Sequence, residues 1–433
     1  MILRFGVENY RSFREPVEIS FVSTARKDEP DLRFPASGTR YGVLPVLGVW
    51  GGNATGKSNL VSAILELSRL VEVSFASQGA NEPLKWTPWR MEDGPDAAPT
   101  TFSLDLMVDG VRHHYGFRFR ASGIDEEWLF YWPSTSRRIL FHRNHDEEDP
   151  WYIGPSLRGN KSQILEATRR NALFLSTAAQ FNHEQLSAVA RLISKGIVFN
   201  PGHQGSSRLL FHNESQLNRP ERRAGLVSLL HAADIGVSDI RFVPDLQATE
   251  GFVKVLSKEN TGTAVRELLT SISSDKPFLE PRLVHGTEST GTWEAPTQYE
   301  SQGTITYLSW LEGLMYNLAS GRLMVADEID TSLHPELVAA LVGLFTSPES
   351  NPNGAQLLFS THDLDLLSHL RTDEVLLVDK TVEGESQVSV ASDYKGVRSR
   401  DDIRRAYIQG RLRGLPALRD LSRLFAEILR NES

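Results

Sequence analysis

The sequence GGNATGKS, residues 51–58, decides the fold class. It fits the pattern G-x-x-x-x-G-K-[ST], in which glycines let backbone N–H groups curl around phosphate oxygens. The apolar run of residues 43–50 precedes it and is typical of a buried parallel strand. Residues 59–67 follow it with apolar side chains at helical spacing. Because strand, glycine loop and helix occur in this order, we interpret residues 51–58 as a phosphate-binding loop (P-loop) rather than an ordinary glycine turn.

The residue types in this loop suit particular parts of a nucleotide. Lys57 is expected to reach the β- and γ-phosphates, and the Ser58 hydroxyl is expected to bind Mg²⁺. The helix that starts here points its positive end at the anion. The residues expected to bind the nucleotide are Gly51, Gly52, Asn53, Ala54, Thr55, Gly56, Lys57, Ser58 and Asn59.

A second motif, residues 323–328, is a run of four apolar residues that ends in two carboxylates. Asp327 is predicted to hold Mg²⁺, and Glu328 is predicted to polarise the attacking water. Many buried strands end in an acid, so an acidic strand end that faces solvent is the alternative. The P-loop earlier in the chain favours the catalytic interpretation.

A third motif follows another apolar run and reads Phe359-Ser360-Thr361-His362-Asp363. A histidine just past a strand end can hydrogen-bond a γ-phosphate or a water molecule. A lone histidine is usually structural. The order of P-loop, acidic strand and histidine strand favours a catalytic role for His362.

Residues 300–304, Glu-Ser-Gln-Gly-Thr, open a predicted helix that runs to Leu314. A serine and a glycine at a helix N-terminus, here Ser301 and Gly303, can make a second anion-binding site. An ordinary helix cap is the alternative, and the spacing alone does not decide between the two.

Composition narrows the function classes. With 40% hydrophobic and 23% charged residues, the 433-residue chain is neither disordered nor collagen-like, and its length suggests roughly two to three domains. It has no cysteine, which excludes disulfides, thiol catalysis and cysteine-ligated zinc. A net charge of −9 argues against an obligate nucleic-acid coat but leaves room for a local basic groove. Because no apolar run suits a bilayer or a signal peptide, we expect a cytoplasmic protein without a membrane partner.

Periodicity outside the motifs predicts the remaining elements. Period-two patterns in residues 2–7, 17–21 and 100–141 predict strands, with turns at Asp109-Gly110 and Ser122-Gly123. Residues 163–230 have mostly helical spacing. Strand character returns at 281–284, and from there to Lys380 helices and strands are expected to alternate.

Together these motifs resemble ATP-binding-cassette-type (ABC-type) heads of the RecF and structural-maintenance-of-chromosomes class. A closer resemblance is to bacterial abortive-infection-type AAA family ATPases. These are relatives of anti-phage ATPases and of the ATPase half of overcoming-lysogenisation-defect nucleases. The resemblance spans nearly the whole chain and rests also on residues 9–13 (NYRSF), 171–176 (NALFLS), 327–335 (DEIDTSLHP) and 407–411 (YIQGR) with Pro416.

The resemblance implies an α/β fold. It would be a P-loop NTPase head of the ABC type, with a mixed sheet, an N-terminal antiparallel sheet and a helical insert. It implies ATP and Mg²⁺ as cofactors, with Glu328 and His362 as the catalytic residues. It also implies that Ser301 and Gly303 contact the γ-phosphate bound by a second copy, and that residues 331–335 cross the dimer interface. Gln78 is a candidate, by position only, for the glutamine of the family's Q-loop.

Four segments are expected. Residues 1–180 form the N-terminal lobe with the P-loop, and residues 181–280 form a mostly helical insert or cap. Residues 281–390 form the C-terminal lobe with the signature segment (residues 300–304), the acidic strand and His362. Residues 391–433 form an arginine-rich helical tail, with nine arginines against four acids between 396 and 430. The tail is either a solvated or docking face or a contact for nucleic acid or an acidic partner.

The first functional hypothesis is a slow ATPase switch. Two heads would close on two ATP molecules, as a homodimer or higher homo-oligomer, and so control a separate effector such as a nuclease or toxin. A separate effector is expected because only some fifty residues follow Lys380, too few for a nuclease domain. DNA or a phage-derived molecule would be the trigger.

Two other hypotheses remain. The main alternative is a RecF-like DNA-repair head that binds DNA. A nucleotide-binding scaffold that never turns over is the third hypothesis, and the Glu328 carboxylate argues against it.

Overall fold

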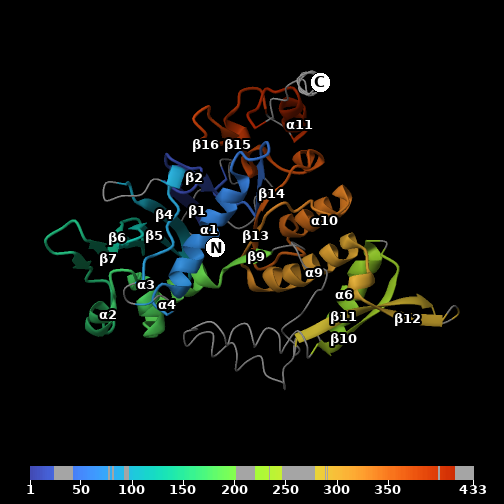
Figure 1. The fold of residues 1–433 in the computed structure, drawn as a ribbon, viewed down its shortest axis with the longest axis horizontal. Helices are drawn as coiled ribbons and strands as arrows, with labels where there is room; N and C mark the ends of the chain where they lie inside the picture. Colours follow the sequence, from blue (N-terminus) through green and yellow to red (C-terminus); the bar gives the residue numbers. More distant parts are fainter. Residues whose placement is uncertain are drawn as a thin grey trace, which may run out of the picture.

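The computed structural model describes residues 1–23, 42–76, 79, 82–91, 97–200, 220–233, 235–245, 278–287, 289, 291–397 and 400–414. These residues form three sheets with helices between and around them (Figure 1). No helix among them is both long and apolar enough to cross a membrane. The Q-loop candidate Gln78 and the tail beyond residue 414 lie outside the described residues.

The first sheet is antiparallel and has the strand order β2-β1-β4-β5-β6-β7-β8. The predicted turn between β4 and β5 is confirmed, and both Asp109 (φ 48°) and Gly110 (φ 77°) adopt the left-handed backbone that tight hairpins need. The strands are β1 (Ile2–Glu8), β2 (Val17–Ser20), β4 (Thr100–Val108), β5 (Val111–Arg120), β6 (Gly123–Trp132), β7 (Arg138–Asn144) and β8 (Trp151–Ile153).

The second sheet has the order β16-β15-β3-β14-β13-β9, and all its neighbours are parallel except β15 and β16. Every residue of β3, β13 and β14 is buried, as expected for parallel strands covered on both faces. The strands are β3 (Val46–Trp50), β9 (Ile197–Asn200), β13 (Leu323–Ala326), β14 (Gln356–Ser360), β15 (Val375–Lys380) and β16 (Ser386–Val390).

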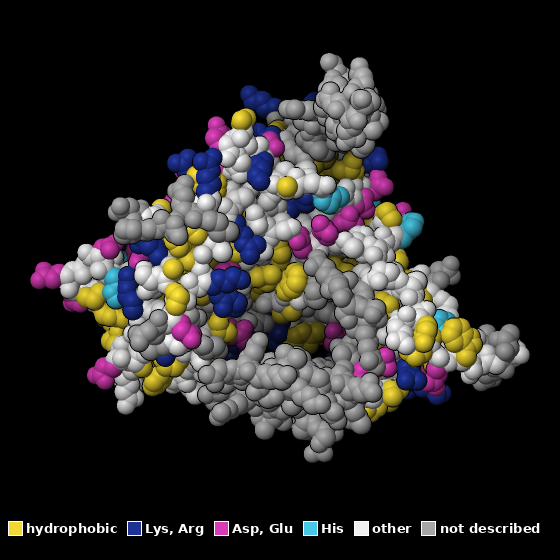
Figure 2. Space-filling model, in the orientation of Figure 1, with side chains coloured by type: hydrophobic (Ala, Val, Ile, Leu, Met, Phe, Trp, Pro, Cys, Tyr) yellow, Lys and Arg dark blue, Asp and Glu magenta, His cyan; other side chains and the backbone are white. Residues whose placement is uncertain are grey.

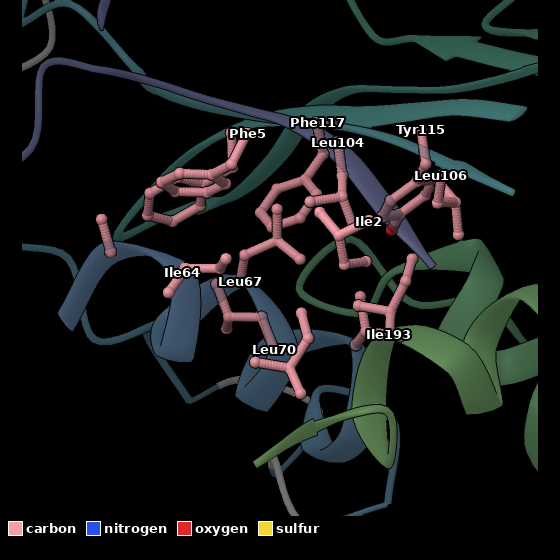
Figure 3. Packing of buried hydrophobic residues seen from close by; sticks show 14 of the residues in the cluster. Ile2, Phe5, Ile64, Leu67, Leu70, Leu104, Leu106, Tyr115, Phe117 and Ile193 are labelled. Atoms are coloured by element: carbon pink, nitrogen blue, oxygen red, sulfur yellow. The ribbon is translucent and has the colours of Figure 1, made fainter. Parts of the chain in front are cut away.

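Helix α1 (Lys57–Val73) joins the two sheets through one hydrophobic core. Its residues Ile64, Leu67 and Leu70 face side chains of the antiparallel sheet, among them Phe5 and Leu104 (Figure 3). Helices α2 (Ser162–Ala167), α3 (Phe174–Gln180) and α4 (Glu184–Ser194) add to the same core. The helix that begins in the P-loop is therefore held rigidly between both sheets.

A second core covers the other face of the parallel sheet. It contains Trp50 and Trp310, and it is built with helices α9 (Gln302–Ser320), α10 (Pro335–Thr346) and α11 (Arg400–Ile408). Short 3₁₀ turns complete the chain path: η1 (Trp89–Met91), η2 (Thr297–Tyr299), η3 (Asp365–Ser368), η4 (Thr372–Glu374) and η5 (Ala391–Asp393).

The third sheet and one helix form an arm, at the opposite end of the molecule from β6 and β7 (Figure 1). The arm consists of α6 (Pro220–Ala232) and the antiparallel strands β10 (Val237–Asp245), β11 (Phe278–Thr287) and β12 (Gly291–Pro296).

Residues 181–280, for which a mostly helical insert is expected, contain both helices and strands in the part that the structure describes. The segment contains α4 and α6, but β9 joins the parallel sheet and β10 belongs to the arm. Four residues between helices are too short a run for periodicity to distinguish strand from helix. The helix expected after His362 is only the short turn η3, and strands β12 and β16 were not predicted.

Two described arginines of the tail, Arg404 and Arg413, contact other parts of their own chain. Arg404 forms an ion pair with Asp365 at 2.8 Å, and Arg413 donates to the side-chain oxygen of Gln387 at 3.0 Å. At least part of the arginine-rich tail is therefore used to pack α11 and its neighbours against the head.

A fully buried carboxylate, Glu127 on β6, holds the start of α3. It accepts hydrogen bonds from the backbone N–H groups of Phe174 (2.6 Å) and Leu175 (3.0 Å) and from the Tyr115 hydroxyl (3.0 Å). Burial raises the pKa of Glu127, whereas the nearby Arg143 charge lowers it. The 171–176 motif thus has a structural role, because two of its backbone N–H groups donate hydrogen bonds to the buried Glu127 carboxylate.

Arg143 on β7 is also buried and holds the residues in front of the same helix. It donates to the carbonyls of Ala172 (2.8 Å) and Arg169 (3.1 Å), and its Nε donates to Nε2 of His145 (2.9 Å). Burial lowers the pKa of Arg143 to about 10. Burial and the charges of Arg143 and Arg170 lower the pKa of His145 to about 4, so the imidazole is neutral in the native protein at pH 7.

This arrangement predicts an acid-sensitive contribution to stability. Because the His145 pKa is about 4 in the folded chain against 6.5 for the free group, its contribution is complete above pH 6.5 and falls as pH drops toward 4. His145→Gln keeps an acceptor for Arg143 but cannot titrate. Between pH 7 and pH 5, urea unfolding should show the wild type losing about 1 kcal/mol more than this variant, allowing for solvent screening. Equal losses would show that His145 does not contribute.

Candidate nucleotide site

The P-loop connects β3 to α1, and close packing requires its glycines. A Cβ atom on Gly51 would lie 2.3 Å from the carbonyl oxygen of Val378, and one on Gly56 would lie 2.3 Å from Oγ of Ser386. Gly56 also has φ 117°, a left-handed backbone that side chains rarely adopt, and Ala54 has φ 62°. The loop therefore curls tightly in front of α1, as a phosphate cradle requires.

Lys57 is buried and its ammonium lies over the loop. Nζ donates to the carbonyl oxygens of Gly51 (3.0 Å) and Gly52 (3.1 Å). Burial lowers the pKa of Lys57, and the carboxylates of Asp327, Glu328 and Asp330 raise it. The charges of the acidic residues at and after the end of β13 therefore act on the P-loop lysine.

Ser360, the last residue of β14, organises the end of β13. Its hydroxyl donates to Oδ1 of Asp327 and accepts from the backbone N–H of Glu328 at 2.8 Å. Glu328 has φ 53°, and its side chain is exposed at the sheet edge. Strained backbone of this kind is common where function fixes a side chain in place.

His362 is placed by the segment that follows β14. The Thr361 hydroxyl donates to Oδ1 of Asp330 at 2.7 Å, and the backbone N–H of His362 donates to Oδ2 of the same residue at 3.4 Å. The His362 side chain is exposed. Asp330 thus joins the loop after β13 to the loop after β14.

The strand order explains why these groups meet. β3, β14 and β13 are parallel neighbours, so their carboxyl ends lie at one edge of the sheet. The P-loop, His362 and the pair Asp327 and Glu328 follow these three ends. In the same region, where β14 and α10 lie, Figure 2 shows acidic and histidine side chains gathered on the surface.

Ser301 and Gly303 lie elsewhere. Ser301 is exposed and caps α9, with its Oγ accepting from the Thr304 N–H at 3.1 Å. A Cβ on Gly303 would lie 3.0 Å from the carbonyl oxygen of Ser332, so the signature segment adjoins residues 331–335 of the same chain. Among the described residues, no hydrogen bond joins Ser301 or Gly303 to the P-loop.

Several residues that support the P-loop or the end of β13 were not predicted from the sequence. Lys380 donates from Nζ to the Ala54 carbonyl at 3.0 Å, and the Ser386 hydroxyl donates to the Thr55 carbonyl. Both belong to β15 and β16, far along the chain, and no local pattern marks them. Ser360 lies two residues before His362 in the sequence and could have been found from that position.

The N-terminal NYRSF motif also supports this region. Arg11 donates to the Ser62 hydroxyl at 3.0 Å, and Asn59 donates from its side-chain amide to the Ser12 hydroxyl at 2.7 Å. The loop after β1 is thereby attached to the first turns of α1. This gives the motif a structural role beside the P-loop.

The donor groups fit a Mg²⁺ ion together with a nucleotide. Ser58 presents an exposed hydroxyl in the first turn of α1, and Asp327 is a half-buried carboxylate fixed by Ser360. Hydroxyl, carboxylate and phosphate oxygens are the ligands that Mg²⁺ prefers. These two residues would hold the ion, which would neutralise phosphate charge.

Comparison with known families agrees with the site. Residues 46–368, about three quarters of the chain, match the family described as "AAA domain, putative AbiEii toxin, Type IV TA system". No curated protein matches the chain. The matched range begins with β3 and includes the P-loop, the signature segment, the acidic strand and His362. The chain therefore belongs to this AAA-domain family of P-loop ATPases, and its parallel-rich sheet with an antiparallel N-terminal sheet is the fold of a P-loop NTPase head.

Proposed function

We propose that the chain is the ATP-binding and ATP-hydrolysing switch subunit of an abortive-infection-type anti-phage defence complex. Two copies close over two ATP molecules, each P-loop facing the signature segment of the other copy. Closure and slow hydrolysis control a separate effector, such as a nuclease or toxin, in response to DNA or a phage-derived trigger.

One observation carries the proposal. The P-loop, Asp327 with Glu328, and His362 follow three adjacent parallel strands, whereas the Ser301 hydroxyl is exposed and attached to none of them. In this proposal, one chain supplies half of the phosphate site and the second copy supplies the other half. The exposed N-terminus of α9 offers further N–H donors to an anion on another molecule.

The chain's own groups suit hydrolysis. P-loop N–H groups and Lys57 bind the phosphates, and a bound Mg²⁺ would offset their charge. Glu328 accepts a proton from the attacking water, and its backbone is held by Ser360. His362 contacts the γ-phosphate or this water from the loop after β14.

The simplest test removes the P-loop ammonium. Lys57→Ala should weaken binding of a fluorescent ATP analogue by about 10- to 100-fold, because a charge-assisted phosphate contact contributes about 1.5–3 kcal/mol. Equilibrium titration by fluorescence anisotropy measures the affinity. Lys395 is an exposed lysine outside the loop sequence, and Lys395→Ala is the control that should bind as the wild type does. In cells that carry the chain with its neighbouring genes, Lys57→Ala should also remove phage protection. Unchanged affinity and unchanged protection would refute the proposal.

A further inference from the structure

The arm contacts the signature segment at Glu300, the first residue of that segment, whose side chain is largely buried. This residue directly precedes Ser301, and its side chain is only 9% exposed. Its Oε1 lies 2.7 Å from Nε2 of His285 on β11, whose side chain is 19% exposed. The residue in front of the exposed phosphate-binding serine is therefore tied to the arm.

His285 is itself fixed from two further sides. Its Nδ1 lies 3.1 Å from the Gly236 carbonyl oxygen, just before β10. Its ring stacks on Trp293 of β12, with centroids 4.5 Å apart and planes 19° apart. Trp293 is 59% exposed, and hydrophobic side chains are visible on the surface of the arm in Figure 2. His285 thus connects all three strands of the arm to Glu300.

The link continues into α9. The Glu300 N–H donates to the Thr297 carbonyl at 3.0 Å, which fixes the turn before the helix. Further along α9, the Tyr307 hydroxyl donates to the Leu229 carbonyl of α6 at 3.3 Å. Since α9 begins at Gln302 with Ser301 as its cap, a shift of the arm relative to α9 moves the backbone that carries Ser301.

We propose that Glu300 and His285 are positioning residues for the second half of the ATP site, and that the arm sets Ser301 through them. This inference rests on the proposed function, in which Ser301 meets the phosphate bound by another copy. A contact made on the arm then changes how well two heads close on ATP, without any contact to the P-loop.

The arm contains a matched ion pair for comparison. Arg241 on β10 pairs with Glu294 on β12, and both side chains are more exposed than the pair of Glu300 and His285. This pair lies within the arm sheet. Glu294→Ala removes one negative charge, as Glu300→Ala does, but leaves the His285–Glu300 link in place.

The experiment measures two quantities in the Glu328→Gln background, which favours the ATP-bound assembly. Mass photometry across a range of protein concentrations, with ATP and Mg²⁺, gives the dissociation constant for the assembly of two copies of the chain. Fluorescent ATP-analogue titration of the dilute monomer gives P-loop affinity. Glu300→Ala should weaken assembly about tenfold and change monomer affinity less than about twofold, because only a buried charged hydrogen bond is lost.

Two companion variants separate positioning from general damage. Glu300→Gln keeps an oxygen acceptor for His285 and should restore assembly to within about threefold of the background, as expected for one retained hydrogen bond. Glu294→Ala should leave assembly unchanged. Assembly of Glu300→Ala equal to the background, or equal weakening by Glu294→Ala, would overturn the inference while leaving the proposed function intact. If the Glu328→Gln background itself never assembles with ATP, the proposed function fails and the inference fails with it.

Discussion

Glu328→Gln should lower the steady-state rate of ATP hydrolysis by about 10²- to 10⁴-fold, the range expected when a positioned general base is removed. The amide has nearly the shape of the carboxylate but cannot accept the proton of the attacking water. The backbone N–H of residue 328 still donates to Ser360, so the local structure should persist. Because ATP binds but is not cleaved, the closed ATP-bound pair should accumulate.

Mass photometry of wild type and Glu328→Gln, with and without ATP and Mg²⁺, measures this accumulation. Protein expressed together with its neighbouring gene product also shows whether the effector is retained. Glu336→Gln is the control, because this exposed acid lies in the first turn of α10 and its N–H is capped by His334. If neither the wild type nor Glu328→Gln changes its oligomeric state when ATP is added, contact between copies at Ser301 is contradicted. The scaffold hypothesis is then favoured.

The nucleotide half-site was predictable because each of its parts is local in sequence. The P-loop, the pair Asp327 and Glu328, and His362 each follow a short apolar strand directly. In a parallel sheet, residues that follow neighbouring strands must meet at one edge. Each motif can therefore be recognised at a strand end from the sequence, and the strand order β3-β14-β13 of the structure brings the three to one edge.

The parts that were missed depend on long-range packing. Ser386 supports the P-loop from a strand more than 300 residues away, and nothing in its neighbours marks it. Strand β12, with the sequence GTWEAP, contains glycine and proline that suit turns, and its pairing with β11 overrides that tendency. The link between His285 and Glu300 joins two segments whose registers only the folded arm defines.

The buried carboxylate Glu127 is a further feature of the core that the sequence pattern does not predict. A glutamate in the middle of a strand normally indicates a solvent-facing position, and β6 has two in succession, Glu126 and Glu127. Alternation requires that one face inward. The alternating pattern does not predict that the inward-facing Glu127 accepts hydrogen bonds from the backbone of α3, which begins 47 residues later.

Glu127→Ala should lower the free energy of unfolding by about 3–5 kcal/mol, the cost of removing one member of a buried charged group. The substitution leaves the N–H groups of Phe174 and Leu175 and the Tyr115 hydroxyl without their acceptor. It also removes the Glu127 charge, which raises the pKa of the buried Arg143 guanidinium. Both losses occur in surroundings that exclude water, so solvent cannot replace the missing partner.

The neighbouring residue provides the control. Glu126 is 23% exposed and pairs with Arg118 at 3.5 Å and His142 at 2.8 Å, so Glu126→Ala should cost less than about 1 kcal/mol. Urea unfolding at pH 7 without nucleotide measures both variants. Similar losses at the two positions would mean that the Glu127 contacts do not stabilise the head. A large loss only at Glu127 would show that the fold of the antiparallel sheet and the position of α3 depend on the same buried carboxylate.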